Sequence, residues 1–335
     1  MPFEIVKPGI RIDFIGKRRL AAGLSIGFLA VSLVVAAVQG VRVGIDFAGG
    51  MELQMKFDPA RSVDEGQIRQ VVGGLDGVEG LMVVRFGEAE DHEFLIRFQT
   101  ESEEVGGAVA PEGEGEEGGA LVHADLVTLI QGALTEALGP NTARRIEFVG
   151  PRVGKELRND GLFALLVASG FILVYIWIRF TLRFSPGAIV AVVHDLLVTA
   201  GLFVILGMEF DLRILAAMLA IMGYSLNDTI IIYDRIRENM GLRTSYDLPE
   251  VLNESINQTL SRTVLTSGTT LLALFSLFFL GGEVIRPFAF AMIIGVLVGT
   301  YSSIYIAAPV LLLLETRFGD APQAPRGKQA KKARA

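Results

Sequence analysis

Hydrophobic residues along this chain gather into six long runs, separated by segments rich in charged and polar residues. The hydrocarbon core of a bilayer is about 30 Å thick, and a helix of about 20 apolar residues crosses it. All six runs reach or approach that length, so each is predicted to be a transmembrane helix. The predicted spans are 20–38, 161–178, 186–206, 212–233, 264–280 and 288–314.

The first run, 20–38, has a second interpretation because a basic stretch, GKRR, comes directly before it. Such a lead is also typical of a cleaved signal peptide, whose apolar core is usually about 7–15 residues long. The run here is longer, and further spans follow it. An uncleaved first transmembrane helix is therefore favoured, with cleavage as the alternative.

Residues 39–160 form the one long segment that is polar enough to fold in water. Alternating apolar residues predict strands, and apolar residues at helical spacing predict helices, the first of which is expected to be capped by Ser62. The predicted strands are 51–57, 81–86, 93–99 and 143–150, and the predicted helices are 62–75 and 121–134. The order strand–helix–strand–strand–helix–strand predicts a ferredoxin-like α+β domain.

Two glycine-rich stretches interrupt or precede that pattern. Residues 101–120 hold seven glutamates and six glycines without an aromatic residue, which predicts a flexible acidic insert. The stretch GIDFAGG at 44–50 superficially suggests a phosphate-binding loop. A lone glycine-rich turn is weak support for nucleotide binding. The favoured interpretation is a tight turn from the first span into the first strand.

The composition narrows the function classes. The chain is 51% hydrophobic with a mean hydropathy of +0.49, which is too apolar for an ordinary soluble protein of 335 residues. It has no cysteine and three scattered histidines, so neither a disulfide nor a metal centre is expected. No region combines basic patches with aromatic residues, so nucleic-acid binding is not expected either. No catalytic residues are identified, and the protein is predicted not to be an enzyme.

Charge is unevenly distributed along the chain. Lysine and arginine are enriched in alternate short segments, and in membrane proteins such segments stay in the cytoplasm. The basic segments are 1–19, 179–185, 234–263 and 315–335. The segment 39–160 instead carries 23 acidic and 11 basic residues. Both termini are therefore predicted to be cytoplasmic, and the α+β domain extracytoplasmic.

Several charged residues lie inside or at the ends of the predicted spans. His194 and Asp195 are near the middle of the third, and Asn227 and Asp228 are in the fourth. A carboxylate near the centre of a span costs about 2.5–3.5 kcal/mol on insertion scales and usually faces the interior of a bundle. Tyr224 shares a helix face with Asp228 because it lies four residues earlier.

The fifth and sixth spans add hydroxyl groups and glycines. Thr266 and Thr270 follow Arg262 at one-turn spacing and predict a hydroxyl stripe on that face of the helix. In the sixth span, Gly295 and Gly299 have the GxxxG spacing that lets helices approach closely. Ser302 and Ser303 follow them and are predicted, with the other polar groups, to support a polar column through the bundle.

Depth in the membrane allows two of these groups to interact. Asp228 lies roughly 9 Å to the cytoplasmic side of the midpoint of its span, at 1.5 Å per residue. Arg262 stands at the cytoplasmic start of the next span. Asp228 is thus predicted to gain and lose a proton, while Arg262, which cannot deprotonate, acts electrostatically. Asp195 is nearer the middle of the bilayer.

Motifs along nearly the whole chain resemble those of SecF, in the SecD/SecF family of the RND superfamily. In chain order they are IDFIGKRR, GIDFAGG, VGPRVGKELRNDG, HD, GYSLNDTIIIYDRIREN, NQTLSRTVLTS and GTYSSIYIA. The motifs of the fourth and sixth spans carry the resemblance most specifically. The acidic insert at 101–120 departs from the family pattern.

The resemblance implies a polytopic protein of a bacterial inner membrane that forms half of a twelve-span RND-type bundle with SecD. It further implies association with the SecYEG channel and with an unfolded preprotein in transit. Protons are the expected coupling ion, with no cofactor. By position in the motifs, Asp228 and Arg262 match the proton path, and Asp195 matches the aspartate of the third-span motif.

Two other functions remain as alternatives. An RND-type exporter of small molecules or lipids usually has twelve spans in one chain and two large external domains, which disfavours it here. A passive translocon-assembly factor has no need of charged groups in its spans, so the polar column disfavours it as well.

Overall fold

The computed structural model describes residues 11–87, 89–99, 117–180, 183–244 and 246–318. Its described residues divide into two compact units. One unit covers 43–162, and the other contains the helices before and after that segment. The two units are described in turn.

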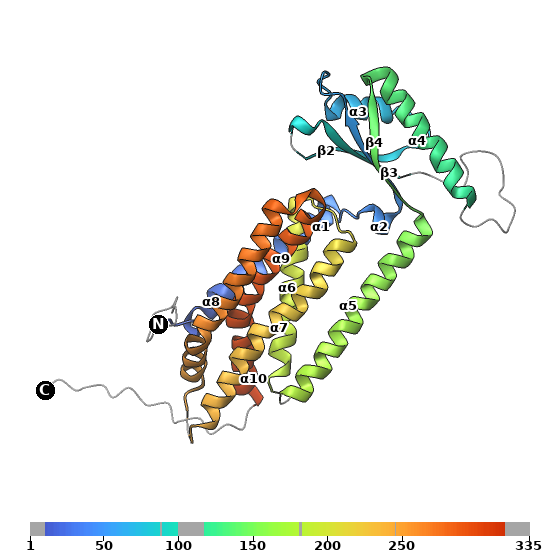
Figure 1. Cartoon of the computed structure of the whole chain (residues 1–335). Coiled ribbons are helices and arrows are strands. Elements are labelled where there is room, and N and C mark those ends of the chain that lie inside the picture. The colour runs from blue at the N-terminus through green and yellow to red at the C-terminus, as the bar shows by residue number, and fades with distance from the viewer. Residues whose placement is uncertain (1–10, 88, 100–116, 181–182, 245, 319–335) are drawn as a thin grey trace. The chain divides into compact units, whose positions relative to one another are not determined.

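The smaller unit contains a four-stranded antiparallel sheet (Figure 1). The strands are β1 (Gly50–Phe57), β2 (Glu79–Phe86), β3 (Glu93–Gln99) and β4 (Asn141–Val149), in the order β2–β3–β1–β4. The helices α3 (Glu65–Val72) and α4 (Glu117–Leu138) pack together on one face. This order and layering confirm the predicted ferredoxin-like domain.

Strand alternation explains how this unit forms its core. Met51, Leu53 and Met55 alternate along β1 and are fully buried, while the residues between them point to the other face. On that other face, Lys56 forms an ion pair with Glu93 on β3 at 3.3 Å. The hydrophobic face is covered by α3 and α4, whose Ile68 and Ile130 are also fully buried.

The glycine pair before β1 is required by the backbone. Gly49 and Gly50 follow the single-turn helix α2 (Ile45–Ala48) and have φ values of +78° and +137°. A Cβ at Gly50 would lie 2.6 Å from the carbonyl oxygen of Phe98 on β3. Only glycine adopts such angles this close to a neighbouring strand without strain.

Two details of the domain differ from the sequence prediction. Asp64, not Ser62, caps α3: its side chain accepts the backbone N–H of Gln67 at 2.9 Å, and the Gln67 side chain accepts the N–H of Asp64. This reciprocal capping box satisfies two helix-end donors at once, which Ser62 is too far upstream to do. Of the predicted acidic insert, 101–116 lies outside the described residues, and the remainder opens α4, which starts at Glu117.

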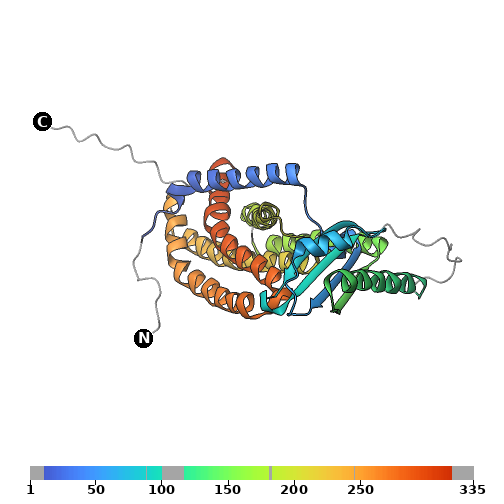
Figure 2. The ribbon, with the colours of Figure 1, turned by 90° about the horizontal axis from the view of Figure 1, so that it is seen from above.

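Within the described residues, six helical segments are long and apolar enough to cross a membrane, which confirms the predicted six-helix class. They are α1 (Arg18–Gln39, preceded by the 3₁₀ turn η1, Ile15–Lys17), α5 (Pro151–Arg179), α6 (Ser185–Leu206), α7 (Leu212–Gly241), α8 (Leu248–Leu280), and the sixth, built from α9 (Gly282–Ser302), η3 (Ser303–Ala307) and α10 (Ala308–Phe318). Seen from above, α1 lies at the edge of the bundle (Figure 2). Of the predicted tail 315–335, residues 319–335 lie outside the described part.

The segment 234–263, predicted from its charges to be a loop, is mostly helical. Helix α7 continues to Gly241 and α8 begins at Leu248, so only a short link remains between them. The added turns are stabilised by polar contacts between the two helices: the Asn239 amide donates to Ser255 at 2.8 Å, and Arg235 donates to Gln258 at 2.6 Å. Apolar residues at helical spacing add to these contacts: Leu248, Leu252 and Ile256 of α8 are buried in the same core as Ile236 of α7.

Helix α8 also fastens the residues that precede α1. The Asn253 side chain accepts the backbone N–H groups of Phe14 and Ile15, at 2.9 and 3.0 Å. Its amide donates to Asp13, which accepts the N–H of Gly16 as well. The Gly16 N–H, followed by the Asn253 amide, lowers the pKa of Asp13. The start of α1 is thereby bound to the first turns of α8.

Helices α7 and α9 run parallel and meet at four successive levels. At each level a residue of α7 faces a small residue of the sixth span. From one level to the next, both residues of the pair advance by four positions. The pairs are Ile221–Gly295, Ser225–Gly299, Thr229–Ser303 and Tyr233–Ala307. Small residues at this spacing let two helix backbones approach closely. We call this contact the α7–α9 seam.

The lower half of the seam contains a π-helical turn, η3 (Ser303–Ala307). Pro309 follows it and has no N–H for the carbonyl of Tyr305, so the regular α-helical pattern is interrupted there. At the same level the hydroxyl of Tyr233 donates to the carbonyl oxygen of Ala307 at 2.9 Å. Single π turns of this kind are frequent at functional sites.

Candidate functional site

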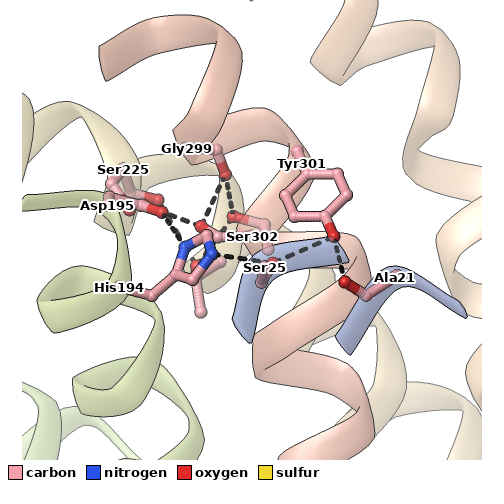
Figure 3. Close-up of polar contacts among 10 residues, drawn as sticks. Ala21, Ser25, His194, Asp195, Ser225, Gly299, Tyr301 and Ser302 are labelled. Atoms are coloured by element: carbon pink, nitrogen blue, oxygen red, sulfur yellow. Dashed lines mark hydrogen bonds and ion pairs between the residues drawn. The ribbon is translucent and has the colours of Figure 1, made fainter. Parts of the chain in front are cut away.

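Two of the buried aspartates in the bundle, Asp195 and Asp228, contact the α7–α9 seam. Asp195, on α6, is completely inaccessible to solvent and has hydrogen-bond partners on both oxygens (Figure 3). Oδ2 accepts from the Ser225 hydroxyl at 2.5 Å and from the Ser302 hydroxyl at 2.7 Å. Oδ1 lies 2.9 Å from Nδ1 of His194. The hydrogen-bonding capacity of this carboxyl group is therefore well used.

His194 continues the network towards α1. Its Nε2 lies 3.0 Å from the hydroxyl of Ser25, which lies 3.1 Å from the hydroxyl of Tyr301 (Figure 3). Tyr301 in turn donates to the carbonyl oxygen of Ala21 at 2.8 Å. One polar network thus joins α1, α6, α7 and α9 inside the apolar bundle.

Asp228, on α7, is only 1% exposed but has a much poorer set of partners. Its Oδ2 accepts from Ser267 on α8 and from Thr300 on α9, both at 3.3 Å. These two hydroxyls also hydrogen-bond each other at 2.8 Å. Their two hydrogens therefore serve three contacts, and neither hydroxyl is committed to Asp228 alone. Oδ1 of Asp228 is buried without a hydrogen-bond partner among the described residues.

Arg262 lies near Asp228 but does not pair with it. Within the described part of the chain the guanidinium group forms no ion pair, and its side chain is exposed on the bundle surface. Its positive charge nevertheless acts on the Asp228 carboxyl group through space. The direct contact that their matching depths allowed is therefore absent in this conformation.

The hydroxyl stripe predicted on α8 is rotated by about one residue in the structure. Thr266 and Thr270 donate to carbonyl oxygens of their own helix, those of Arg262 and Thr266, both at 3.0 Å. Such bonds to the preceding turn satisfy a hydroxyl without any tertiary partner. Ser267 faces inwards instead and reaches Asp228. The sequence prediction missed Ser267 and Thr300 because it followed the face that carries Arg262.

The other predicted site residues fall into two groups. Ser302 reaches Asp195, and Ser303 reaches Thr229 across the seam at 2.8 Å. The predicted packing glycines, Gly295 and Gly299, both lie against α7. Asn227, by contrast, points away from the bundle, and the hydroxyl of Tyr224 is buried without a hydrogen-bond partner among the described residues.

His194, Ser225, Ser25 and Tyr301 were not predicted as site residues. The HD pair in the third span was the one available signal for His194. Ser25 lies 169 positions from His194 in the sequence, and nothing in its own apolar run marks it. Its role depends on which face of α1 packs against α6, and sequence periodicity does not determine that face.

Helices α7 and α8 each have a row of exposed small or polar side chains at helical spacing, whereas α1 exposes leucine, isoleucine and valine. These exposed residues are Ala216, Ala220, Gly223 and Asn227 on α7, and Arg262, Thr269, Ala273 and Ser276 on α8. We call them the small-residue face. In lipid, small and polar residues of this kind are typical of helix–helix contacts.

Buried carboxyl groups of this kind can bind a proton. Among the described residues no group of three or more histidine, aspartate and glutamate side chains is arranged to hold a metal ion. Asp228 has a free buried oxygen beside two hydroxyls, an arrangement that can accept a proton. Both oxygens of Asp195, by contrast, have hydrogen-bond partners.

Family models match two parts of this chain. The model of the C-terminal region of the protein-export membrane proteins SecD and SecF matches residues 130–317, which include both aspartates. The model of the SecD/SecF GG motif matches residues 34–60 and thus contains the Gly49–Gly50 pair.

Curated relatives match over most of their length. The protein translocase subunit SecF of Desulfurispirillum indicum is 40% identical over 311 residues, which cover 92% of this chain and 93% of the relative. The SecF subunit of Pseudomonas aeruginosa is 41% identical over 304 residues, covering 90% and 91%.

Solved structures of SecDF are similar as well. The crystal structure of SecDF from Thermus thermophilus, described as a translocon-associated membrane protein, superposes with a TM-score of 0.77 at 34% identity. It covers 92% of this chain but only 39% of the SecDF chain. A second SecDF crystal form, called super-membrane-facing, gives a TM-score of 0.64 at 35% identity and covers 94% and 40%. The chain therefore spans about two fifths of the SecDF chains it matches.

Proposed function

The chain belongs to the SecD/SecF family of protein-export membrane proteins, among its SecF members, and from this premise we propose that it uses proton flow to promote protein export as an auxiliary subunit of the Sec translocase. The observation that supports proton coupling best is Asp228, a buried carboxyl group with one unpartnered oxygen. Its partners in export are the SecYEG channel and the unfolded preprotein.

The proposed partner within the membrane is SecD. SecDF chains contain a part that matches this chain and a longer remainder outside the match. The small-residue face of α7 and α8 is the surface that a second six-helix bundle would cover. Asn227 and Arg262 lie on it, and both are unfavourable when they face lipid. A SecD bundle packed there would shield them and enclose Asp228 and Arg262 together.

The proposed coupling proton binds Asp228. When the carboxyl group is ionised, the exposed Arg262 charge favours it electrostatically without a contact. When it is protonated, the positive charge loses that partner, so the helices that carry the two residues change their preferred arrangement. A proton that crosses the membrane potential releases about 2.3 kcal/mol per 100 mV, enough to drive a shift between two such states.

The proposed location is the bacterial inner membrane, with both termini in the cytoplasm and the α+β domain outside. The basic residues of alternate segments support this orientation. Because the chain has no cysteine, Ser62→Cys in the domain and Thr244→Cys between α7 and α8 provide clean labelling sites. An impermeant thiol reagent applied to intact cells should label the first and not the second; equal labelling would contradict the orientation.

The proton function is tested by Asp228→Asn in inverted membrane vesicles that contain the translocase and SecD. Translocation of a secretory precursor is measured with and without a protonophore. Asparagine keeps the shape of the side chain but cannot ionise, so the protonophore-sensitive part of translocation should disappear while membrane insertion and SecD binding persist.

Asp234→Asn is the matched control, since Asp234 lies on the same helix but pairs with Arg179 at 2.6 Å. It should retain the wild-type response to the protonophore. Arg262→Lys should be partly active, because the charge remains and the planar fork is lost. An Asp228→Asn variant with an undiminished protonophore-sensitive component would leave only a passive assembly role for this subunit.

A further inference from the structure

We propose that the basic residues at the start of α1 bind the phosphate headgroup of an anionic phospholipid. These residues are Lys17, Arg18 and Arg19, which we call the basic turn. Contacts with α8 hold the turn in place, and exposed leucines beside it accommodate the acyl chains. The inference concerns the lipid around the bundle and stands whether or not Asp228 exchanges a proton.

The three positive charges of the basic turn lack matching negative charges. Within the described part of the chain none of the three side chains forms an ion pair, whereas Arg179 pairs with Asp234 at 2.6 Å. Asp13 interacts electrostatically with Lys17 and Arg18 without an ion-pair contact. One carboxylate beside three cations leaves a net positive charge, which attracts an external anion.

The backbone N–H groups at this helix start are already used. Asn253 accepts those of Phe14 and Ile15, and Asp13 accepts that of Gly16. An anion is therefore bound by the side chains of the basic turn and not by the helix end. Positive charges in a first turn also oppose the helix dipole, and α1 has no acidic residue there to offset them. A phosphate group at the turn would offset both the charge and the dipole.

The basic turn lies at the depth of the lipid headgroups. Leu20 follows Arg19 directly and is 67% exposed, and Leu24, one turn further, is 64% exposed. Exposed leucines on a transmembrane helix face the hydrocarbon. At a rise of 1.5 Å per residue, the basic turn is within about 5 Å of Leu20 along the helix axis. Its side chains therefore reach the phosphates while acyl chains pack on the leucines, and α1 lies at the edge of the bundle (Figure 2).

Two asparagines of α8 hold the segment that leads into the basic turn. Asn253 accepts two of its N–H groups, and Asn257 accepts the N–H of Ile12 and donates to the carbonyl oxygen of the same residue, both at 2.9 Å. Phe14 and Ile15, directly before the turn, are buried in the hydrophobic core. The basic side chains thus project from a fixed backbone, and a preorganised site loses less entropy when it binds a ligand.

The charge and the donors of the turn select an anionic headgroup. The guanidinium group of Arg18 donates to the carbonyl oxygen of Ile15 at 2.9 Å, which orients it and leaves other N–H groups for phosphate oxygens. Lys17 and Arg19 are exposed and add two further charges. Phosphatidylglycerol has a net negative charge and fits this set. Phosphatidylcholine carries a choline cation as well, which opposes binding.

The experiment is native mass spectrometry of the full chain in detergent micelles, titrated with phosphatidylglycerol or phosphatidylcholine. Wild type should retain the first phosphatidylglycerol at a lower lipid concentration than phosphatidylcholine. The double variant Lys17→Gln/Arg19→Gln should bind phosphatidylglycerol about 25-fold more weakly, at about fivefold for each charge. Its phosphatidylcholine binding should not change. Equal affinity of wild type for the two lipids, or an undiminished preference in the double variant, would overturn the proposal.

Two controls separate this site from charge in general and from phosphate alone. Arg179→Gln also removes one positive charge, but from a guanidinium group that already pairs with Asp234, so the preference should persist. Millimolar glycerol phosphate has the headgroup chemistry without acyl chains and should not displace the lipid. Loss of the preference in Arg179→Gln, or displacement by glycerol phosphate, would contradict a lipid site at the basic turn.

A further variant tests the role of the asparagines. Asn253→Ala keeps every charge of the basic turn but releases the segment before it, so the preference for phosphatidylglycerol should fall. Asn227→Ala, an exposed asparagine on α7, is the matched control and should bind both lipids as wild type does. A preference that survives Asn253→Ala unchanged would refute a preorganised site, because charge alone would then be sufficient.

Discussion

Asp195 and Asp228 are both buried aspartates beside the α7–α9 seam, yet their surroundings are opposite. Asp195 accepts two close hydroxyls and contacts a histidine, whereas Asp228 accepts two hydroxyls at 3.3 Å and leaves one oxygen without a partner. A carboxylate that is fully hydrogen-bonded resists protonation, and one that is poorly hydrogen-bonded accepts a proton more readily. The comparison favours a structural role for Asp195 and supports the proposal that Asp228 exchanges a proton.

Removing each carboxyl group should give the largest difference between the two sites. Asp195→Ala leaves His194, Ser225 and Ser302 without their common partner, and breaking a buried pair in this way costs about 3–5 kcal/mol. Asp228→Ala removes two long contacts and a partly unsatisfied group, so its cost should be about 1 kcal/mol.

The measurement for this pair is thermal unfolding in nanodiscs, with expression level as a second readout. Asp195→Ala should unfold at a clearly lower temperature than Asp228→Ala. Equal destabilisation of the two variants would remove the distinction between an anchoring and an exchanging aspartate.

A smaller difference is expected when one hydroxyl is removed at each site. Ser225→Ala deletes a close hydrogen bond to Asp195, and such a bond contributes about 0.5–1.5 kcal/mol. Ser267→Ala deletes a long bond in a membrane bundle, where such bonds average about 0.6 kcal/mol. The same unfolding assay ranks them. A greater loss from Ser267→Ala would show that Asp228 is held more firmly than its distances indicate.

The smallest effect is expected at the seam that lies between the sites. Gly295→Ala places a methyl group in the space of the Ile221 side chain, which can move aside, so the cost should be about 1 kcal/mol. Gly223→Ala is the control, since a Cβ there meets nothing within 4 Å. The control is measured without SecD, because a SecD bundle on the small-residue face would cover Gly223. Similar unfolding temperatures for both variants would contradict close packing at the seam.

Gly223→Ala also sharpens the assignment of the small-residue face. If a SecD bundle covers this face, the added methyl group should weaken co-purification with SecD while the isolated chain stays equally stable. Leu272→Ala is the comparison variant, because Leu272 is one of the large apolar residues that α8 exposes. It tests whether a substitution at a neighbouring lipid-facing position weakens co-purification with SecD as much.

Much of this architecture was predictable because it depends on local patterns. The lengths of the apolar runs determine six spans, and the alternation in β1 and β3 determines the sheet. Asp228 was identifiable because a carboxylate within an apolar run is costly in lipid, which makes it a candidate functional residue. The charged segment 234–263 was predicted to be a loop because its charges were considered without its apolar spacing, in which Leu248, Leu252 and Ile256 form the buried face of α8.

The partners of the aspartates were not predictable, since they depend on how helices rotate against one another. Thr266 and Ser267 are adjacent in sequence, and only packing decides that Ser267 faces Asp228. Ser25 and His194 come from distant parts of the chain. The separate roles of Asp195 and Asp228 became visible only when those contacts were compared.

The central claim is that the proposed proton exchange takes place at Asp228 and not at Asp195. Infrared difference spectroscopy of the protein together with SecD in lipid tests it directly, because a protonated carboxyl group has a band that a carboxylate lacks. As the pH is lowered, wild type should gain such a band; Asp228→Asn should abolish it and Asp234→Asn should preserve it. A band that survives in Asp228→Asn and disappears in Asp195→Asn would contradict the account.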